Sequence, residues 1–272
     1  MTKKDVKNLI KAAHAGGKIL RKYFGKTLNI IEKSTVWDFQ TEADLGSEKA
    51  ILKILKAEFP EYNTHSEEEG KFHNGSEYTF VVDPLDGTNN FVMGIPNFSV
   101  SIALLYKDEA IAGVVYQPIL NQTYFAEKQK GSFLNNKRIK VNNVIDSKKV
   151  TIAYACGYKT NRNHIARLMN SLIKSDHKRI TLNWSPAHDY CLLAQGKIES
   201  VITDSGLEIY DYGAGKLIAQ EAGAKIVDFK GKKETSYLND SFIISNKDET
   251  NKYVLSNYEK ITKKTNAKVP KF

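Results

Sequence analysis

The segment YTFVVDPLDGTNNF, residues 78–91, starts as an apolar, β-branched run and passes directly into two aspartates. The run predicts a strand over residues 78–83. Asp83 and Asp86 lie three residues apart across a proline turn, so both carboxylates and the carbonyl of Leu85 between them can converge on one point. The carboxyl ends of strands are where α/β proteins place their sites.

The residue types around this turn predict a particular chemistry. Hard oxygen ligands that converge suit Mg²⁺, and without a cation the like charges would repel and raise the pKa of one carboxyl. Gly87 and Thr88 follow where a turn or helix would begin, so their backbone N–H groups and the Thr88 hydroxyl offer an anion site. Carboxylates, a cation and an anion site in one turn predict chemistry on a phosphate ester.

The segments around this strand predict helices before it and further strands after it. Apolar residues at helical spacing predict amphipathic helices over 5–24 and 43–59, with a polar loop over 32–41 between them. Apolar and β-branched runs predict antiparallel strands over 98–106, 110–118, 122–127 and 131–141. The last of these contains Asn135-Asn136, a pair typical of a hairpin turn.

Strands and helices alternate after Asp146. Helices are predicted over 163–175, 186–196, 212–222 and 247–261, and strands over 150–158, 200–204, 224–229 and 241–246. The order helix, mixed sheet, helix, second sheet, helix predicts a layered α/β fold of α-β-α-β-α type. We expect an N-terminal α+β half over 1–146, a C-terminal α/β half over 147–272, and a site in the cleft between them.

Composition excludes several classes of protein. The 272 residues are 41% hydrophobic and 26% charged, with a formal net charge of +9, a globular balance that excludes fibrous, disulfide-rich and disordered chains. Cys156 and Cys191 lie in apolar segments without Cys or His partners at metal-binding spacing. They predict buried thiols in a reducing compartment rather than a zinc site.

Neither a signal peptide nor a membrane span is predicted. Charges interrupt the first twenty residues, and no run approaches the roughly 18 apolar residues that a span needs. We therefore expect a soluble, cytoplasmic protein. The positive charge comes from 35 Lys and 5 Arg, and residues 259–272 form a lysine-rich tail. Because the bidentate recognition of guanine depends mainly on arginine, this balance predicts a solvated lysine surface rather than a surface that reads DNA or RNA bases. A field that attracts anionic substrates is compatible with this balance.

Three other acidic segments fit the same chemistry, and each also has a simpler structural explanation. Glutamates 67–69 form a run about fifteen residues upstream of the aspartates, and such runs are usually solvated surface. Asp38, Thr41 and Asp44 lie at the start of the second helix, where Thr41 or Asp38 can serve as its N-cap. Asp211 precedes a helix of small residues and can serve as its N-cap. A carboxylate at a helix start can cap the helix and bind metal at once.

The segments SEEE (66–69), DPLDGTNNF (83–91) and DSGLEIYDYGAGKLIAQEAGA (204–224), in this order and spacing, resemble the inositol monophosphatase family of magnesium-dependent, lithium-sensitive phosphatases. The resemblance covers nearly the whole chain, because GVVYQP (113–118) and the hairpin segment 131–141 also look like the family's. It implies a sugar-phosphatase fold, a homodimer, and hydrolysis of a small phosphate monoester by water activated by two or three Mg²⁺ ions. Inositol monophosphate or a related polyol or sugar phosphate is the substrate it implies first. Histidinol phosphate, fructose bisphosphate, phosphoadenosine phosphate and NADP remain open.

The same resemblance implies roles at the metal end of the site. The implied metal ligands are Glu67, Asp83, the Leu85 carbonyl, Asp86 and Asp211. Glu67 and Thr88 match the pair that holds the attacking water, and Asp44 matches an outer carboxylate that supports it.

Further residues match the family's substrate-binding positions. Gly87 and Thr88 match its phosphate-binding amides, and Asp204 matches the acidic residue that holds substrate hydroxyls. The implied substrate-binding set also includes Asp86, Ser185 and Asp211. Lys33 fits a mobile loop that closes near the metals.

The segment NWSPAHDYCLLAQGK, residues 183–197, departs from the family pattern. Trp184 stands in the place of a glycine, and Pro186 follows Ser185. An aromatic side chain here could stack on a substrate ring or fill the core, and we favour packing in the core. The residues that choose the substrate are therefore the least familiar part of the chain.

Three rival functions compete with a metal-dependent phosphatase. A haloacid-dehalogenase phosphatase needs a D-x-D pair with a nucleophilic aspartate, whereas this chain has Asp83-x-x-Asp86. The sequence GAGK at 213–216 hints at a nucleotide-binding P-loop, but Tyr210 stands where a glycine is required and Leu217 where a Ser or Thr is required. An RNA-binding regulator on this scaffold predicts a broken carboxylate set and aromatics interleaved with basic residues, and neither occurs. We therefore expect no nucleic-acid partner.

Overall fold

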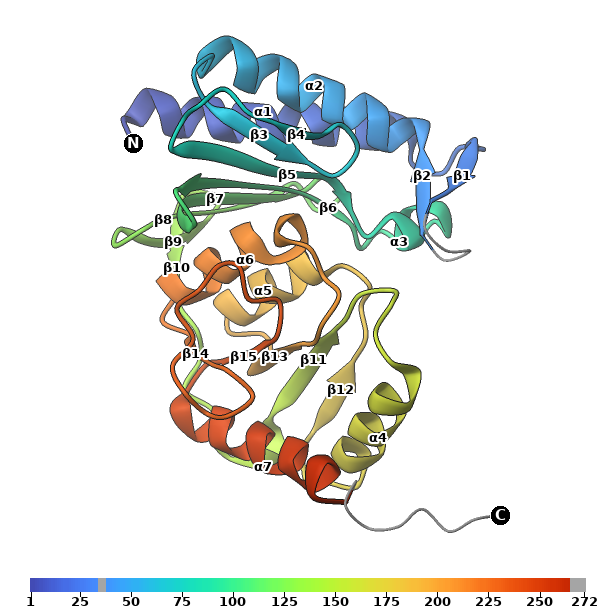
Figure 1. Ribbon diagram of the computed structural model, residues 1–272, viewed down its shortest axis with the longest axis vertical. Helices are drawn as coiled ribbons and strands as arrows, with labels where there is room; N and C mark the ends of the chain where they lie inside the picture. The colour runs from blue at the N-terminus through green and yellow to red at the C-terminus, as the bar shows by residue number, and fades with distance from the viewer. Residues whose placement is uncertain (34–37, 265–272) are drawn as a thin grey trace.

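The structure, a computed structural model, describes residues 1–33 and 38–264. Two large β-sheets, of eight and five strands, alternate with three layers of helices, and a small two-stranded sheet lies beside them (Figure 1). Helices α1 (Lys3–Tyr23) and α2 (Glu42–Glu58) cover the outer face of the first sheet. Helices α5 (Pro186–Ala194) and α6 (Ile209–Glu221) lie between the sheets, and α4 (Arg162–Ile173) and α7 (Asp248–Lys264) cover the second. This order confirms the predicted α-β-α-β-α fold class.

The two N-terminal helices begin at capping boxes and pack closely. Thr2 caps α1, and Thr41 caps α2 with Asp44 as the reciprocal partner in the first turn. A Cβ atom placed on Gly16 of α1 would lie 2.7 Å from the Ile51 side chain of α2, so only glycine permits this approach. The bounds of both helices agree with the prediction to within two residues.

The first sheet has eight strands in the order β10-β9-β8-β7-β6-β5-β3-β4. Its strands are β3 (Asn63–Ser66), β4 (Gly70–Phe72), β5 (Tyr78–Asp86), β6 (Ser99–Tyr106), β7 (Glu109–Gln117), β8 (Gln122–Glu127), β9 (Gly131–Leu134) and β10 (Lys137–Ile139). Strands β3 and β5 pair in parallel, and every other neighbouring pair is antiparallel. Asn135 and Asn136 have φ angles of 46° and 66°, so the hairpin turns where the sequence predicted.

The helices between the sheets depend on small residues. A Cβ atom on Gly215 of α6 would lie 2.5 Å from the Tyr190 ring of α5. Lys216 of α6 is buried, and its Nζ donates to the carbonyl oxygen of Ser236 at 2.6 Å. The GAGK segment is therefore helix interior and not a phosphate-binding loop.

The second sheet has five strands in the order β12-β11-β13-β15-β14. Its strands are β11 (Thr151–Ala155), β12 (Arg179–Thr181), β13 (Ser200–Thr203), β14 (Lys225–Val227) and β15 (Phe242–Ser245). Strand β11 pairs in parallel with β12 and β13, while β15 pairs antiparallel with β13 and β14. A short 3₁₀ helix at Ser147–Lys149 precedes this sheet, and the first sheet ends at Ile139. The division of the chain near residue 146 stays a prediction.

Several short elements were not predicted. The polar loop was expected over 32–41, but residues 39–41 form β2 (Phe39–Thr41), which pairs antiparallel with β1 (Ile30–Glu32), so the prediction was wrong for these residues. All three residues of β1 are exposed, and the two isoleucines with which it begins are too short an apolar run to indicate a strand. Residues 34–37 of that loop and 265–272 of the lysine-rich tail lie outside the described residues.

Two further predictions concern membrane-spanning helices and the burial of the two cysteines. Within the described part of the chain, no helix has the length and hydropathy required to cross a bilayer. Cys191 is buried, as predicted, but Cys156 is only half-buried and lines a cavity. The prediction of a buried Cys156 thiol was therefore wrong, because the chain leaves β11 at this point and enters the loop that borders the cavity.

Candidate active site

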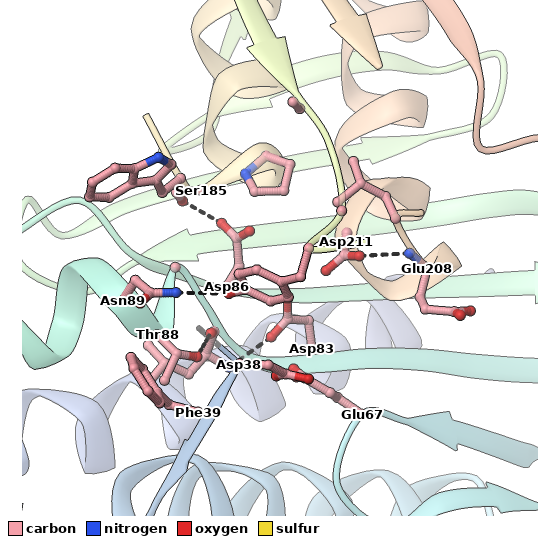
Figure 2. A pocket seen from close by; sticks show the side chains of 18 of the residues that line it. Asp38, Phe39, Glu67, Asp83, Asp86, Thr88, Asn89, Ser185, Glu208 and Asp211 are labelled. Atoms are coloured by element: carbon pink, nitrogen blue, oxygen red, sulfur yellow. Dashed lines mark hydrogen bonds between the residues drawn. The ribbon is translucent and has the colours of Figure 1, made fainter. Parts of the chain in front are cut away.

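A cavity of about 1140 Å³ is lined by the loops that follow β3, β5, β11 and β13 and by the starts of α5 and α6 (Figure 2). Eight of the ten predicted site residues line it: Glu67, Asp83, Leu85, Asp86, Gly87, Thr88, Ser185 and Asp211. Asp44 and Asp204 do not line it. The structure thus brings together side chains that are up to 144 positions apart in the sequence (211 − 67 = 144).

A β-bulge in β5 sets the direction of the two aspartates. Strand β5 pairs with β6 through Asp83↔Ser101 and then through Asp86↔Ser99, so three steps on β5 match two on β6. Side chains alternate between the faces of a strand, and without the extra residue Asp83 and Asp86 would point to opposite faces. The bulge therefore turns both carboxylates to one face. Pro84 has no N–H to donate to the ladder and is tolerated at such a position.

Asp86 is held on several sides by hydrogen bonds. Its Oδ2 accepts from the hydroxyl of Ser99 at 2.9 Å and from the hydroxyl of Ser185 (Figure 2). Its Oδ1 accepts from the backbone N–H of Ala187 at 3.3 Å, in the first turn of α5. Burial raises the pKa of Asp86 to about 6, and these donors limit the rise.

Asp83, Asp211 and Glu67 form a cluster of like charges with Asp86. Burial, and then the charges of Glu67, Asp86 and Asp211, raise the pKa of Asp83 well above its usual range. Burial and the charge of Glu67 do the same to the pKa of Asp211. Burial also raises the pKa of Glu67, and the ammonium of Lys33 opposes the rise. Such a cluster is stable as carboxylates only beside added positive charge.

Lys33 supplies one such charge. Its Nζ lies 2.8 Å from Oε1 of Glu67 and 2.6 Å from Oε1 of Glu68. Although burial disfavours the charged form, the two glutamates raise the pKa of Lys33. The sequence predicted only that Lys33 lies near the site and did not indicate which carboxylates it pairs with.

Thr88 and Asp44 are connected behind the cavity wall. The Thr88 hydroxyl lies 3.2 Å from Oδ1 of Asp44 and 3.0 Å from the Leu85 carbonyl oxygen, and it can donate to either. Oδ2 of Asp44 accepts from the backbone N–H of Thr41 at 2.8 Å and from its hydroxyl at 2.5 Å. Burial raises the pKa of Asp44 to about 7. Thr41 therefore caps α2, Asp44 completes its capping box, and the same Asp44 contacts the site through Thr88, so both explanations offered for this segment apply.

The turn after β5 requires glycine. Gly87 has a φ of 92°, a left-handed conformation that L-residues rarely adopt. A Cβ atom there would lie 3.0 Å from the Asn97 carbonyl oxygen and 3.2 Å from that of Trp184. The turn leads into α3 (Thr88–Val92), so the backbone N–H groups lie at a helix start, as predicted.

Asp211 occupies a different helix position from the one expected. Helix α6 begins at Ile209, and its N-cap is Glu208. The carboxylate of Asp211 accepts from the backbone N–H of Glu208 at 2.7 Å, from the first turn of the helix (Figure 2). The prediction that Asp211 precedes the helix was wrong by three residues, because β-branched Ile209 and aromatic Tyr210 gave no helical signal.

The donor set of the acidic cluster suits a hard metal ion, although its side chains are not arranged around one. In residues 1–33 and 38–264, no three His, Cys, Asp or Glu side chains are already spaced to hold one ion. The carboxylates are engaged instead by protein donors, among them Lys33, Ser185 and the Glu208 N–H. The set is nevertheless all oxygen and mostly carboxylate, and two of its members, Asp83 and Asp211, have pKa values raised by burial and by the charges of other members. These properties fit a hard divalent cation such as Mg²⁺.

The substrate end differs from what the resemblance implied. Oδ2 of Asp204 accepts from the Tyr154 hydroxyl at 2.9 Å and lies 2.9 Å from Nε2 of His164. Asp204 is 5% exposed and does not line the cavity, so in this structure it offers no oxygen to a substrate hydroxyl.

Trp184 does not fill the core. It is 58% exposed and lines the cavity, and its φ is 53°. Our preference for core packing was therefore wrong. Trp184 has a left-handed backbone conformation at a position where the family pattern has a glycine. Neither helical nor strand periodicity in the sequence predicts that a side chain at such a position is exposed.

The chain is similar in sequence to proteins of one family over most of its length. A model of the inositol monophosphatase family matches residues 2–263. The Nus factor SuhB of Pasteurella multocida is 34% identical over 243 residues, covering 87% of this chain and 88% of the relative. The fructose-1,6-bisphosphatase/inositol-1-monophosphatase of Thermotoga maritima is 32% identical over 237 residues, covering 87% and 89%.

Solved structures show the same fold. The extragenic suppressor protein suhB from Bartonella henselae superposes with a TM-score of 0.87 at 28% identity, covering 94% of this chain and 98% of that one. An inositol monophosphatase from Thermotoga maritima gives a TM-score of 0.86 at 28% identity, covering 96% and 99%. The carboxylate cluster, the glycine turn and the matched length agree: the chain belongs to the inositol monophosphatase family, whose members generally depend on Mg²⁺.

Proposed function

We propose that the chain hydrolyses a small phosphate monoester with the help of Mg²⁺. The observation that supports this most is the bulge in β5, which turns Asp83 and Asp86 to one face beside Glu67 and Asp211, directly before the Gly87 turn. Hydrolysis forms a bond from a water oxygen to phosphorus and breaks the bond from phosphorus to the ester oxygen. Inorganic phosphate and an alcohol leave.

The acidic cluster would hold the metal. The ligands would be Glu67, Asp83, the Leu85 carbonyl, Asp86 and Asp211, with two or three Mg²⁺ ions. When bound, Mg²⁺ would offset the charge of the phosphate dianion and lower the pKa of a water molecule. The ammonium of Lys33, which pairs with Glu67 and Glu68, would be displaced from Glu67 by the incoming cation.

The other residues would place the water and the phosphate. The Thr88 hydroxyl donates to Asp44 or to the Leu85 carbonyl, so its lone pairs are available to accept a hydrogen bond from the attacking water. Glu67 would orient the same water. The backbone N–H groups of Gly87 and Thr88 would hold the phosphate oxygens at the start of α3.

Phosphate release tests the proposal. The esters would be inositol 1-phosphate, fructose 1,6-bisphosphate and glycerol 2-phosphate, with Mg²⁺, with EDTA and with added lithium. The variants would be Asp86→Asn and, as a matched control, Asp108→Asn, because Asp108 is exposed and does not line the cavity. We expect release that needs Mg²⁺, survives in the control and is lost in Asp86→Asn. No release from any ester by folded protein with Mg²⁺ would exclude the proposal. The homodimer that the resemblance implies is tested separately, by the mass of the particle in solution.

A role linked to nucleic acid is the second candidate. Relatives about one-third identical to this chain are named Nus factor SuhB, and the chain carries a formal net charge of +9. Binding to single-stranded RNA would be measured at several salt concentrations, because contacts with phosphates weaken steeply as salt rises. Salt-dependent binding without phosphate release would favour this candidate over the phosphatase.

A further inference from the structure

An exposed tryptophan lies at the mouth of the cavity. The side chain of Trp184 is 58% exposed, and its backbone has a φ of 53°. A bulky residue rarely adopts this conformation, which places Cβ against the carbonyl oxygen. Strained residues of this kind persist where the surrounding structure fixes them, and they gather at ligand sites.

Hydrogen bonds fix the backbone on both sides of Trp184. The Asn183 carbonyl accepts from the side-chain amides of Asn90 at 2.7 Å and Asn97 at 2.9 Å. On the other side, the Ser185 hydroxyl donates to Asp86. The indole is therefore presented by a rigid segment while its own surface stays largely uncovered. A tryptophan held in this way is ordered before any ligand arrives, so little conformational entropy is lost when one binds.

Trp184 is next to the phosphate turn. Its carbonyl oxygen would lie only 3.2 Å from a Cβ atom on Gly87, so the two backbones are in contact. A ligand with its phosphate at Gly87 would have its next atoms beside Trp184. Because Trp184 also lines the cavity, the group that leaves with the ester oxygen is the part of the substrate that can reach the indole.

Other large apolar side chains lie on this rim, beside the polar Asn89 and Lys159. Tyr158, Met93 and Leu182 line the cavity and are 54%, 54% and 49% exposed. The Tyr158 hydroxyl accepts from the side-chain amide of Asn89 at 2.8 Å, which holds that ring in place. Large apolar side chains that stay uncovered around a cavity indicate a binding surface.

The acidic residue expected to hold hydroxyls is turned away. Asp204 is engaged by Tyr154 and lies beside His164, and it does not line the cavity. The cavity therefore has the exposed aromatic surface of Trp184 in its lining and lacks the oxygens of Asp204 as hydroxyl acceptors. Both features disfavour the binding of a leaving group with many hydroxyls and favour the binding of a flat apolar one.

We propose that Trp184 selects phosphate esters whose alcohol carries a planar aromatic group, which stacks on the indole. The proposal rests on the proposed phosphatase function and adds the substrate class to it. Trp184 is a specificity residue here and takes no part in the bond changes at phosphorus.

A binding experiment tests the stacking without turnover. Benzylphosphonate and cyclohexylmethylphosphonate have a phosphorus group that water does not remove, and they differ in having a flat or a puckered ring. Inorganic phosphate serves as the reference ligand. The chain has two tryptophans, so in a Trp37→Phe background Trp184 is the sole source of tryptophan fluorescence. With Mg²⁺ present, we expect benzylphosphonate to quench this fluorescence and to bind about three- to tenfold more tightly than the puckered analogue, the range measured for aromatic pairs.

Two substitutions separate stacking from apolar packing. Because these variants lack the Trp184 fluorescence, their affinities and that of the wild type for the same phosphonates are measured by isothermal titration calorimetry. Trp184→Leu keeps an apolar side chain without a ring, and it should remove the preference for benzylphosphonate. Trp184→Phe should restore most of it. Leu182→Ala is the control, since it removes apolar surface from the same rim and should weaken both phosphonates alike.

The outcomes distinguish the two proposals. If phosphate binds but the two phosphonates bind equally, or if Trp184→Leu weakens both to the same extent, the stacking proposal is overturned and the phosphatase proposal stands. If phosphate itself does not bind and no ester releases phosphate, both proposals fail.

Discussion

The metal end and the substrate end of the cavity are built in different ways. At the metal end, Asp83, Leu85, Asp86, Gly87 and Thr88 come from one continuous stretch of chain at the end of β5. At the substrate end, the lining comes from separate loops, around Tyr158 after β11 and around Trp184 before α5. Most of the metal end is therefore set by one local segment, which Glu67 after β3 and Asp211 of α6 complete, whereas the substrate end depends entirely on how distant segments meet.

This difference indicates at which positions of the cavity a substitution would be tolerated. The carboxylates of the metal end are buried together, and each one depends on the charges and donors around it. Replacing one leaves the others unbalanced. An exposed rim side chain such as Trp184 has few such partners, so it can change without disturbing the reaction. We therefore expect the reaction to be set by the metal end and the choice of ester by the substrate end.

The largest expected effect compares two aspartates seven residues apart, Asp211 at the metal end and Asp204 at the substrate end. Asp211→Asn should lower kcat/KM on the order of 10³-fold, because a charged member of the metal site is lost. Asp204→Asn should change kcat/KM less than about tenfold, because its carboxylate serves Tyr154 and His164 rather than the cavity. Steady-state phosphate release from one ester measures both. Equal losses would show that Asp204 turns into the cavity when substrate binds.

The second prediction concerns pH and Mg²⁺. Burial raises the pKa of Asp86 to about 6 and of Asp44 to about 7. In the unfolded chain these carboxyls lose their protons at about pH 4, whereas in the folded protein without metal they keep them to higher pH. The folded state therefore binds more protons between about pH 4 and pH 7, so its free energy of unfolding falls as pH rises through this range. The fall is at most about 1.4 kcal/mol per pH unit for each group. Mg²⁺ favours the ionised carboxylates, so its stabilising effect should grow over the same range. Thermal unfolding with Mg²⁺ and with EDTA at several pH values measures this. Mg²⁺ stabilisation that is independent of pH would contradict the account of the cluster.

Ser185 connects the two ends, since it follows Trp184 and donates to Asp86. Its hydrogen bond lowers the pKa of Asp86, so Ser185→Ala should raise it further. We expect activity to fall about tenfold, as is common when a supporting hydrogen bond to a metal ligand is lost. The acidic limb of the pH profile should move to higher pH, because Asp86 then ionises later. An unchanged acidic limb would mean that Ser185 acts on the substrate and not through Asp86.

The smallest expected effect is on stability at the rim. Trp184→Gly removes a bulky residue from a left-handed backbone, where an L-residue costs roughly 1 kcal/mol. The lost contacts of a side chain that is 58% exposed oppose this gain. We expect the free energy of unfolding in urea to stay within about 1 kcal/mol of the wild type. A loss well beyond that would show that the indole packs in solution.

The long elements of the fold could be predicted because their own residues carry the signal. Helices α1 and α2 show apolar spacing, and strands β6, β7 and β8 are continuous apolar or alternating runs. The short strands β1, β4 and β12 have mostly exposed or half-buried residues and depend on their neighbours. The sequence could not indicate them.

The candidate site divides in the same way. The convergence of Asp83 and Asp86 was predicted from their spacing, although the strand continues through a bulge and does not end in a turn. The direction of Asp204 was not predictable, because it depends on Tyr154 and His164, which are 50 and 40 residues away. The exposure of Trp184 depends on amides of Asn90 and Asn97 from the other half of the chain.

The central claim is that the acidic cluster binds Mg²⁺ and that this binding drives hydrolysis. The most direct measurement is one Mg²⁺ titration with two readouts, thermal stability and phosphate release, on the wild type and on Asp211→Asn. We predict that both readouts in the wild type rise with the same Mg²⁺ midpoint, and that in Asp211→Asn the midpoint of stabilisation moves to higher Mg²⁺ while release is lost. Stabilisation without any phosphate release, or release that does not depend on Mg²⁺, would contradict the claim.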